Sequence, residues 1–289
     1  MTHKSLYTIG GCTFEISGSP LTEAVDALPG FAPFRSSQPS PVTFRIGYCA
    51  DDVHPAPVRT MHTFSAEGVT TIFSASAEGY LLQMRHVAGH ELALWCDTDR
   101  QIFCFKGDTV PVLLRFALWI AYGLGTLACR RIALHSSCIV KDGQAFLFLG
   151  ESGTGKSTHT RLWQEHIPGS FLLNDDSPVI SAGTDGIWVY GSPWSGKTPC
   201  YRTECYPLGG CIRLSQAREN RMRRLPVIQA YAALHPSCPP QFAYDETLYD
   251  GISDILDNLL SQIPVYHLAC LPDAEATQLS YLYLSSSGF

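Results

Sequence analysis

A glycine-rich segment followed by lysine and two hydroxyl residues is the stretch of this sequence best suited to chemistry. Residues 150–158 read Gly-Glu-Ser-Gly-Thr-Gly-Lys-Ser-Thr, which fits the pattern Gly-x-x-x-x-Gly-Lys-Ser. The glycines allow the backbone to wrap its N–H groups around an anion. Lys156 would reach the β- and γ-phosphates of a nucleotide, and the Ser157 hydroxyl would bind Mg²⁺. We expect this loop to bind the nucleotide through Gly150, Glu151, Ser152, Gly153, Thr154, Gly155, Lys156, Ser157 and Thr158.

The flanking segments supply the context that this motif requires. Ala145–Leu149 is a short run of large apolar residues, which is typical of a strand buried on both faces. Residues 157–166 can start a helix whose positive N-terminal end would face the bound phosphates. The alternative is a glycine-rich turn between a strand and a helix with an incidental lysine.

Two adjacent carboxylates form a second candidate group. Residues 171–176 read Phe-Leu-Leu-Asn-Asp-Asp, a buried strand that ends in Asp175 and Asp176, and the C-terminal ends of strands are where α/β sheets bind ligands. One carboxylate there can hold Mg²⁺, and the other can accept a hydroxyl proton. The predicted Mg²⁺ ligands are Ser157 and Asp176. Neighbouring side chains point to opposite sides of a strand, so we expect separate roles, although the pattern does not decide which aspartate is the base. An Asx-type turn is the alternative.

Three basic side chains are further candidates. His135 lies in the apolar run Arg131–Val140, part of which we expect to form a hairpin with the strand before the glycine-rich loop, and a buried core histidine is the alternative. Lys197 ends a glycine loop, and Lys197 or Arg202 could neutralise charge on a phosphoryl group in transfer. Phosphoryl transfer needs positioned phosphates, a metal and a proton acceptor. The predicted catalytic residues are therefore Asp175, Asp176, His135, Lys156 and Lys197.

The order and spacing of these segments resemble the nucleotide domain of the HPr kinase/phosphorylase group, whose P-loop fold is shared with ATP-dependent phosphoenolpyruvate carboxykinase. The resemblance implies Mg²⁺-ATP binding and phosphorylation of a serine hydroxyl on a protein or peptide. It also implies that Asp175 or Asp176 serves as base and metal partner, with His135 beside them. The segments that resemble this group are Leu134–Ser137, Phe148–Thr158 and Leu172–Asp176, and those similar to a divergent HPr-kinase-related branch are Gly191–Lys197, Tyr206–Leu208, Val265–Leu268 and Pro272–Ala276.

Sequence patterns predict two domains. The predicted fold class is α/β, or α+β when the chain is taken as a whole. Residues 1–108 carry alternating apolar patterns, so we expect a mainly antiparallel β domain that binds a substrate or partner. Residues 109–289 would form the P-loop kinase domain. The apolar run Val110–Cys129 has the length of a membrane span, but it contains Arg115 and opens on proline, which favours a buried helix. The predicted N-terminal strands are Tyr7–Ile16, Val42–Tyr48, Val69–Ser76, Tyr80–His86, Glu91–Cys96 and Gln101–Lys106.

The composition limits the class of protein further. The 289 residues are 45% hydrophobic and 16% charged, which describes a well-buried globular protein. A net charge of −6 argues against nucleic acid as a partner, and the cluster Arg218–Arg224 is the one basic segment that stands out. The eleven cysteines form no Cys-x-x-Cys pair, so we expect reduced, mostly buried thiols in a cytoplasmic protein with no membrane partner. A zinc site at Cys200, Cys205 and Cys211 is disfavoured by its spacing.

The favoured hypothesis is a kinase that uses Mg²⁺-ATP to phosphorylate a hydroxyl, with serine preferred. The acceptor, a peptide, protein or metabolite, is not specified by the sequence, and neither is the base of the nucleotide. The alternative is a nucleotide-binding switch or assembly module without transfer chemistry, and a plain NTPase lies between the two. Paired carboxylates favour the kinase because nucleotide binding alone does not require them. A homo-oligomer is compatible with these observations.

Overall fold

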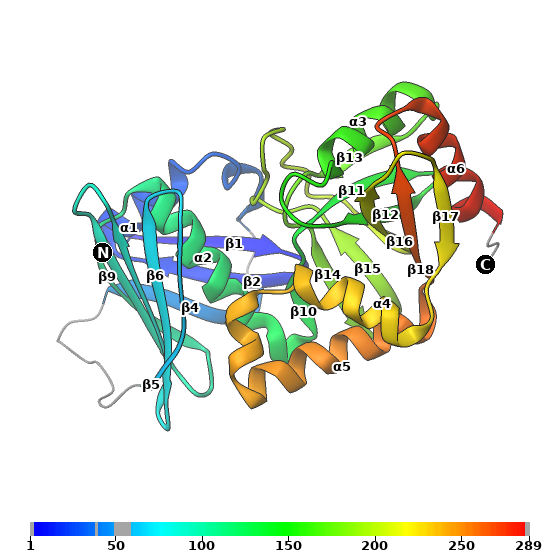
Figure 1. Ribbon diagram of the computed structural model, residues 1–289. Coiled ribbons are helices and arrows are strands. Elements are labelled where there is room, and N and C mark those ends of the chain that lie inside the picture. The colour runs from blue at the N-terminus through cyan, green and yellow to red at the C-terminus, as the bar shows by residue number, and fades with distance from the viewer. Residues whose placement is uncertain (1–2, 38–39, 49–58, 287–289) are drawn as a thin grey trace. The chain divides into compact units, whose positions relative to one another are not determined.

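The computed structural model describes residues 3–37, 40–48 and 59–286. It is a mixed α/β structure with two large sheets and several helices (Figure 1). The chain divides into two compact units. The first unit consists of Met1–Cys129 together with Gln241–Asp250, and the second consists of Arg130–Pro240 together with Gly251–Phe289. The sequence had suggested a boundary at residue 108, whereas the helix that follows this residue lies in the first unit.

The first unit is built on one sheet, which has nine strands within the described residues. Their order is β3-β1-β2-β4-β9-β8-β7-β6-β5, and all pairs are antiparallel except β2–β4 and β4–β9. A mainly antiparallel sheet is what the sequence predicted for this region. The strands are β1 (Lys4–Ile9), β2 (Cys12–Ser17), β3 (Arg35–Ser36), β4 (Val42–Tyr48), β5 (Arg59–Ala66), β6 (Val69–Ser76), β7 (Gly79–His86), β8 (Glu91–Asp97) and β9 (Ile102–Gly107).

One predicted strand in this unit is wrong. The alternating run Tyr7–Ile16 is not a single strand but parts of two, β1 and β2, which form an antiparallel hairpin. Gly10 and Gly11 make the turn at φ values of 56° and 76°, a backbone conformation that favours glycine. The hairpins β6–β7 and β8–β9 are confirmed.

Among the described residues, helices α1 (Ser19–Asp26) and α2 (Pro111–Thr126) belong wholly to the first unit, which also includes the first residues of α5 (Glu246–Gln262). The segment Pro111–Cys129 is long and apolar enough to cross a membrane. However, 67% of an 18-residue apolar stretch within it is buried inside the structure. Near its centre the Tyr122 hydroxyl donates a hydrogen bond to the Ile9 carbonyl at 3.0 Å. A mostly buried α2 agrees with the buried helix that the sequence predicted. Short 3₁₀ helices cover Ala32–Phe34 and Leu127–Cys129.

The second sheet also has nine strands among the described residues. Its main path runs β10-β14-β15-β16-β12-β11-β13, while β18 pairs with the long strand β16 and β17 pairs with β18. The strands are β10 (Arg131–Ala133), β11 (Ser136–Lys141), β12 (Gln144–Leu149), β13 (Phe171–Asn174), β14 (Val179–Gly183), β15 (Gly186–Tyr190), β16 (Cys205–Gln216), β17 (Arg221–Arg224) and β18 (Val265–Cys270). The helices are α3 (Lys156–His166), α4 (Val227–Leu234), α5 (Glu246–Gln262) and α6 (Ala274–Ser286), with 3₁₀ turns at His235–Ser237 and Pro240–Tyr244.

The direction of the strands gathers the candidate residues at one edge of this sheet. Strand β11 is antiparallel to both β12 and β13, so β12 and β13 run the same way. Strand β12 is parallel to β16, and β16 is parallel to β18. The glycine-rich loop after β12, the aspartates after β13 and the start of β11 therefore lie at the same edge, where α/β sheets bind ligands.

Apolar packing fixes helix α3 behind this edge. Phe146 and Phe148 of β12 pack with the fully buried Trp163 of α3 in one core cluster. Helix α6 packs beside α3, and the Trp163 indole donates to the Ser280 hydroxyl of α6 at 2.9 Å. The start of α6 is capped by Asp273, whose carboxylate accepts the Ala276 N–H at 2.9 Å. Helix α3 is thus held from two sides.

The cysteines are mostly as expected from the sequence. Nine of them, within the described residues, are free thiols, and four of these nine are not buried. Cys104 in β9 departs from the expectation because it is disulfide-bonded.

Candidate functional site

The glycine-rich loop has the backbone conformation that a phosphate-binding loop requires. Gly150, Gly153 and Gly155 have φ values of 150°, 81° and 111°, which residues with side chains rarely adopt. A Cβ on Gly150 would also approach the Thr154 side chain to 3.1 Å. Helix α3 begins directly after the loop, at Lys156. The N–H groups of its first turn have no partners within the helix, so they point at whatever anion the loop holds.

Lys156 is folded back over the loop. Its ammonium group donates to the Gly150 carbonyl at 2.7 Å and to the Glu151 carbonyl at 3.3 Å, and the residue is only 8% exposed. Burial lowers the pKa of Lys156, and the charges of Asp176 and Asp175 oppose that shift. An ammonium group has three N–H donors, so two carbonyls leave capacity for a phosphate oxygen. The predicted contact of Lys156 with nucleotide phosphates stays a prediction.

The two aspartates differ in their surroundings. Asp175 is 5% exposed, and both of its carboxylate oxygens are used: Oδ1 accepts from the Ser137 hydroxyl at 2.6 Å and Oδ2 from the Thr198 N–H at 3.3 Å. The Asp176 side chain is 39% exposed and lies 3.8 Å from the His135 imidazole. Its other oxygen accepts from the Ser177 hydroxyl at 3.0 Å. The separate roles expected for the pair are thus matched by separate environments, with Asp176 as the accessible carboxylate.

His135 lies beside the aspartates, but not within a strand as predicted. The run Arg131–Val140 is divided at His135, because β10 pairs with β14 while β11 pairs with β12 and β13. At this break the His135 N–H donates to the Ser237 carbonyl at 2.7 Å. Burial lowers the pKa of His135, the charge of Lys156 lowers it further, and Asp176 opposes both. The imidazole therefore favours its neutral form, which can accept a proton.

Asn174 is a site residue that sequence reasoning missed. It is fully buried, and its carbonyl oxygen accepts the N–H groups of Asp176 at 2.9 Å and Ser177 at 2.8 Å. Its amide nitrogen donates to the Ser192 carbonyl at 3.2 Å, the Ser192 hydroxyl at 3.1 Å and the Trp194 carbonyl at 3.2 Å. The Asx-type turn is thus made by Asn174 and orients the aspartates. Its position at the end of a strand was the available signal, since asparagine commonly bonds the backbone two residues on.

The loop before Lys197 is brought to the aspartates, whereas the Lys197 ammonium group is not. A Cβ on Gly196 would lie 2.9 Å from the Asp175 carbonyl, so the backbones are in close contact. Lys197 itself is exposed and forms no ion pair among the described residues. Arg202 is engaged elsewhere, because its guanidinium pairs with Glu204 at 3.4 Å and lies 4.9 Å from the centre of the Phe171 ring. Neither is shown to contact the aspartates.

The donor set fits magnesium held mainly by phosphates and water. Ser157 is exposed in the first turn of α3, and Asp176 offers an accessible carboxylate. No cluster of three or more His, Cys, Asp or Glu side chains suited to a metal occurs in the described part of the chain. One hydroxyl and one carboxylate suffice for Mg²⁺ bound with a nucleotide, because this ion keeps several waters. Zinc at Cys200, Cys205 and Cys211 has no such cluster to support it within the same residues.

A cavity of about 470 Å³ adjoins the phosphate loop. It has room for the nucleoside part of a nucleotide whose phosphates lie in the loop. One wall is His159 of α3, whose ring contacts Phe148 and whose Nε2 lies 3.2 Å from the Ser280 hydroxyl. Burial lowers the pKa of His159 to about 4, so it is neutral. The other walls come from the loop and the ends of β16 and β18, with Gly153, Gly155, Thr158, Gln216 and Leu271 among them.

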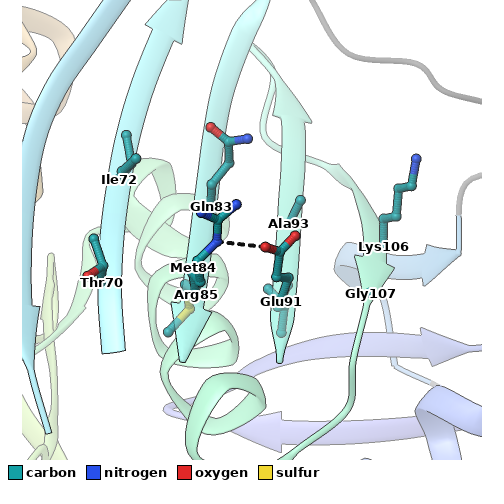
Figure 2. Close-up of a pocket in the computed structure, with 10 residues that line it drawn as sticks. Thr70, Ile72, Gln83, Met84, Arg85, Glu91, Ala93, Lys106 and Gly107 are labelled. Carbon is teal, nitrogen blue, oxygen red and sulfur yellow. Dashed lines mark hydrogen bonds and ion pairs between the residues drawn. The ribbon is translucent and has the colours of Figure 1, made fainter. Parts of the chain in front are cut away.

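The first unit carries a second cavity, of about 480 Å³, on the face of its sheet (Figure 2). Arg85 of β7 and Glu91 of β8 form an ion pair across it at 2.6 Å, and Gln83 and Lys106 lie along it. The lining of this hollow is mostly apolar, with Arg85, Glu91 and Lys106 as its charged groups, and it contains no nucleophile placed beside a base. The neighbouring His90 pairs with Asp108 at 3.2 Å.

Two comparisons with known proteins found no match. No protein-family model matches the sequence, and no curated protein matches it either. The resemblance to HPr kinases therefore rests on the sequence motifs alone.

Proposed function

We propose that this protein is a kinase that transfers the γ-phosphoryl group of ATP to a hydroxyl, with serine preferred. The observation that carries the proposal is the convergence of Lys156, Asp176 and His135 at the edge of the sheet where the phosphate loop begins. The specific fold proposed is the P-loop nucleotide domain of HPr kinases and ATP-dependent phosphoenolpyruvate carboxykinase. We place the protein in the cytoplasm, where ATP is available.

Each residue has a role in the proposed transfer. The backbone N–H groups of the loop and the Lys156 ammonium hold the phosphates and neutralise the developing charge. Ser157 and Asp176 would hold Mg²⁺ bound with ATP, Asp176 through a water that leaves its carboxylate able to accept a proton, and the ion would supply charge neutralisation at the phosphate oxygens. The acceptor oxygen attacks the γ-phosphorus, the bond to the β–γ bridging oxygen breaks, and the hydroxyl proton passes to Asp176. Asp175, with both oxygens hydrogen-bonded, positions the neighbouring carboxylate instead.

A neutral His135 suits this arrangement. A protonated imidazole 3.8 Å from Asp176 would pair with the carboxylate and weaken it as a base. Burial and the charge of Lys156 both lower the pKa of His135, so the carboxylate keeps its proton affinity for the acceptor. His135 is also able to receive the proton from Asp176 afterwards.

The test uses γ-labelled ATP, Mg²⁺ and a lysate of the source cells. Label is counted separately in macromolecules, small molecules and free phosphate, with the Lys156→Ala variant as control. Label in either of the first two fractions, absent with the variant, is the expected result and identifies the class of acceptor. Label found only as free phosphate would contradict the kinase and point to an NTPase.

A nucleotide-binding switch is the second candidate, and the hollow on the first unit, which combines an apolar lining with Arg85, Glu91 and Lys106, favours it (Figure 2). Such a protein would bind Mg²⁺-ATP tightly while the first unit binds a partner. It predicts measurable ATP binding with no phosphorylated product in any fraction. Detection of a phosphorylated acceptor would exclude it.

A further inference from the structure

Three basic side chains form a row across the second sheet. Strand β18 pairs with β16 and with β17 (Figure 1). Arg213 of β16 is the cross-strand neighbour of His267 of β18, and His267 is the neighbour of Arg223 of β17. Residues in register point to the same face of a sheet. Their chain neighbours Leu214, Leu268 and Met222 belong to the apolar core that includes Trp163 of α3. The basic row therefore lies on the opposite face from α3.

This row has no acidic counterpart. Among the described residues, no ion pair joins Arg213, His267 or Arg223 to a carboxylate, whereas the nearby Arg221 pairs with Glu219 at 2.9 Å. The polar contacts of the row are neutral. Arg223 donates to the Gln229 side chain at 2.9 Å, and His267 Nε2 lies 2.8 Å from the Ser215 hydroxyl.

Like charges in register destabilise a sheet, so the arrangement costs folding free energy unless an anion offsets it. The two arginines also act on the histidine. Burial first, and then the charges of Arg223 and Arg213, lower the pKa of His267. A bound anion would cancel the two charge effects and raise that pKa again.

A cavity lies at the Arg213 end of the row, next to the phosphate loop. Arg213 and Ser215 line a hollow of about 360 Å³ together with Glu151, Gly153 and Thr154. Arg213 is also the cross-strand neighbour of Leu149, the last residue before the loop. The hollow is therefore bounded by guanidinium and hydroxyl donors on one side and by the outer part of the loop on the other.

We propose that Arg213, His267 and Arg223 form a second oxyanion site, beside the phosphate loop and without Lys156, that binds a phosphate-class dianion. Arginine matches such anions because its planar group donates parallel hydrogen bonds, and the Ser215 hydroxyl adds one more donor. The anion is either free phosphate or the phosphoryl group of a larger molecule. This site does not depend on the proposed phosphoryl transfer.

The test follows His267 by NMR while inorganic phosphate is added. Imidazole resonances of protein labelled with ¹⁵N-histidine are recorded, and His267 is identified by its absence in His267→Gln. We expect the resonance to move saturably and the pKa of His267 to rise. No movement, or an equal movement with sodium chloride at matched ionic strength, would overturn the proposal.

Single-residue variants test which side chains bind the phosphate. Replacement of Arg213 or Arg223 by Gln removes charge-assisted hydrogen bonds and should weaken phosphate binding by about tenfold or more each. Arg224→Gln is the matched control, because it lies next to Arg223 in β17 on the opposite face, opposite Tyr266. Lys156→Ala should leave the response of His267 intact, since it alters only the phosphate loop. Equal effects of Arg223→Gln and Arg224→Gln would contradict the assignment.

The source of the anion is distinguished by comparing inorganic phosphate with glycerol phosphate. Tighter binding of the monoester would identify the phosphoryl group of a larger molecule, and tighter binding of inorganic phosphate would identify the free ion. Glu151→Gln should strengthen binding of either, because its carboxylate lines the same hollow. Each variant is compared with the wild-type protein by circular dichroism, so that loss of folding is separated from loss of binding.

Discussion

Replacing Asn174 by Ala should destabilise the second unit more than the loss of so small a side chain suggests. The side chain is fully buried and joins two segments: the aspartate turn through two accepted hydrogen bonds, and the Ser192–Trp194 segment through its amide nitrogen. Removing it leaves the Asp176 N–H and the carbonyls of Ser192 and Trp194 without this partner. The Ser177 N–H keeps a second, longer bond to the Trp194 carbonyl at 3.3 Å.

The magnitude follows from these contacts. Each buried group left without a partner costs about 1–3 kcal/mol, and about two such groups are not rescued by other contacts. We therefore expect a loss of about 3 kcal/mol in the free energy of unfolding. Asn258→Ala is the matched control, because that half-buried side chain donates one bond to a carbonyl, that of Ala182 at 3.0 Å. Its loss should cost about 1 kcal/mol.

Urea unfolding followed by tryptophan fluorescence measures both values. The Asn174→Ala protein should also bind nucleotide through its intact phosphate loop but transfer phosphate more slowly, because Asp176 is no longer held. If Asn174→Ala costs no more than Asn258→Ala, the hydrogen bonds drawn from the structure do not orient the turn, and the reasoning fails.

Three further predictions concern the same unit. Lys156→Ala should weaken nucleotide binding at least about tenfold in calorimetry, while the exposed Lys197→Ala should change it little. Asp176→Asn should slow phosphoryl transfer by about 10²–10⁴-fold without loss of stability, whereas Asp175→Asn should lower the urea midpoint of unfolding. Equal behaviour of the two variants would refute the separate roles assigned to the two aspartates. The pKa of His159 is lowered to about 4 from its usual 6.5, so the unfolded chain binds the proton more readily. Stability should therefore fall by about 2 kcal/mol as the pH drops from 7 to 5, and His159→Gln should lose that dependence.

The features that could be predicted from the sequence are those that depend on contiguous residues. The loop between β12 and α3 could be recognised because its glycines, lysine and hydroxyls are contiguous and flanked by a strand and a helix. Hairpins such as β6–β7 followed from short polar turns between alternating runs. The same method failed at Gly10 and Gly11, where a two-residue turn interrupts an alternation that continues on both sides.

The remaining site features depend on contacts between distant residues. The role of Asn174 depends on Ser192 and Trp194, which no local pattern connects to it. The break at His135 arises because β10 and β11 pair with different strands. The basic row depends on the register of two pairings, one between β16 and β18 and one between β18 and β17, and register is not readable from one strand alone.

The discontinuous first unit has a consequence for how the protein is made. Its core includes the fully buried Phe242, whose ring lies 6.3 Å from that of Phe73, and Tyr80 donates to Asp245 at 3.0 Å. Domains usually fold in order as they leave the ribosome, but this unit lacks Gln241–Asp250 until most of the second unit has been synthesised. A nascent chain stalled after residue 129 should therefore remain open to chaperones and proteases, and the N-terminal unit should reach its native state only near the end of translation.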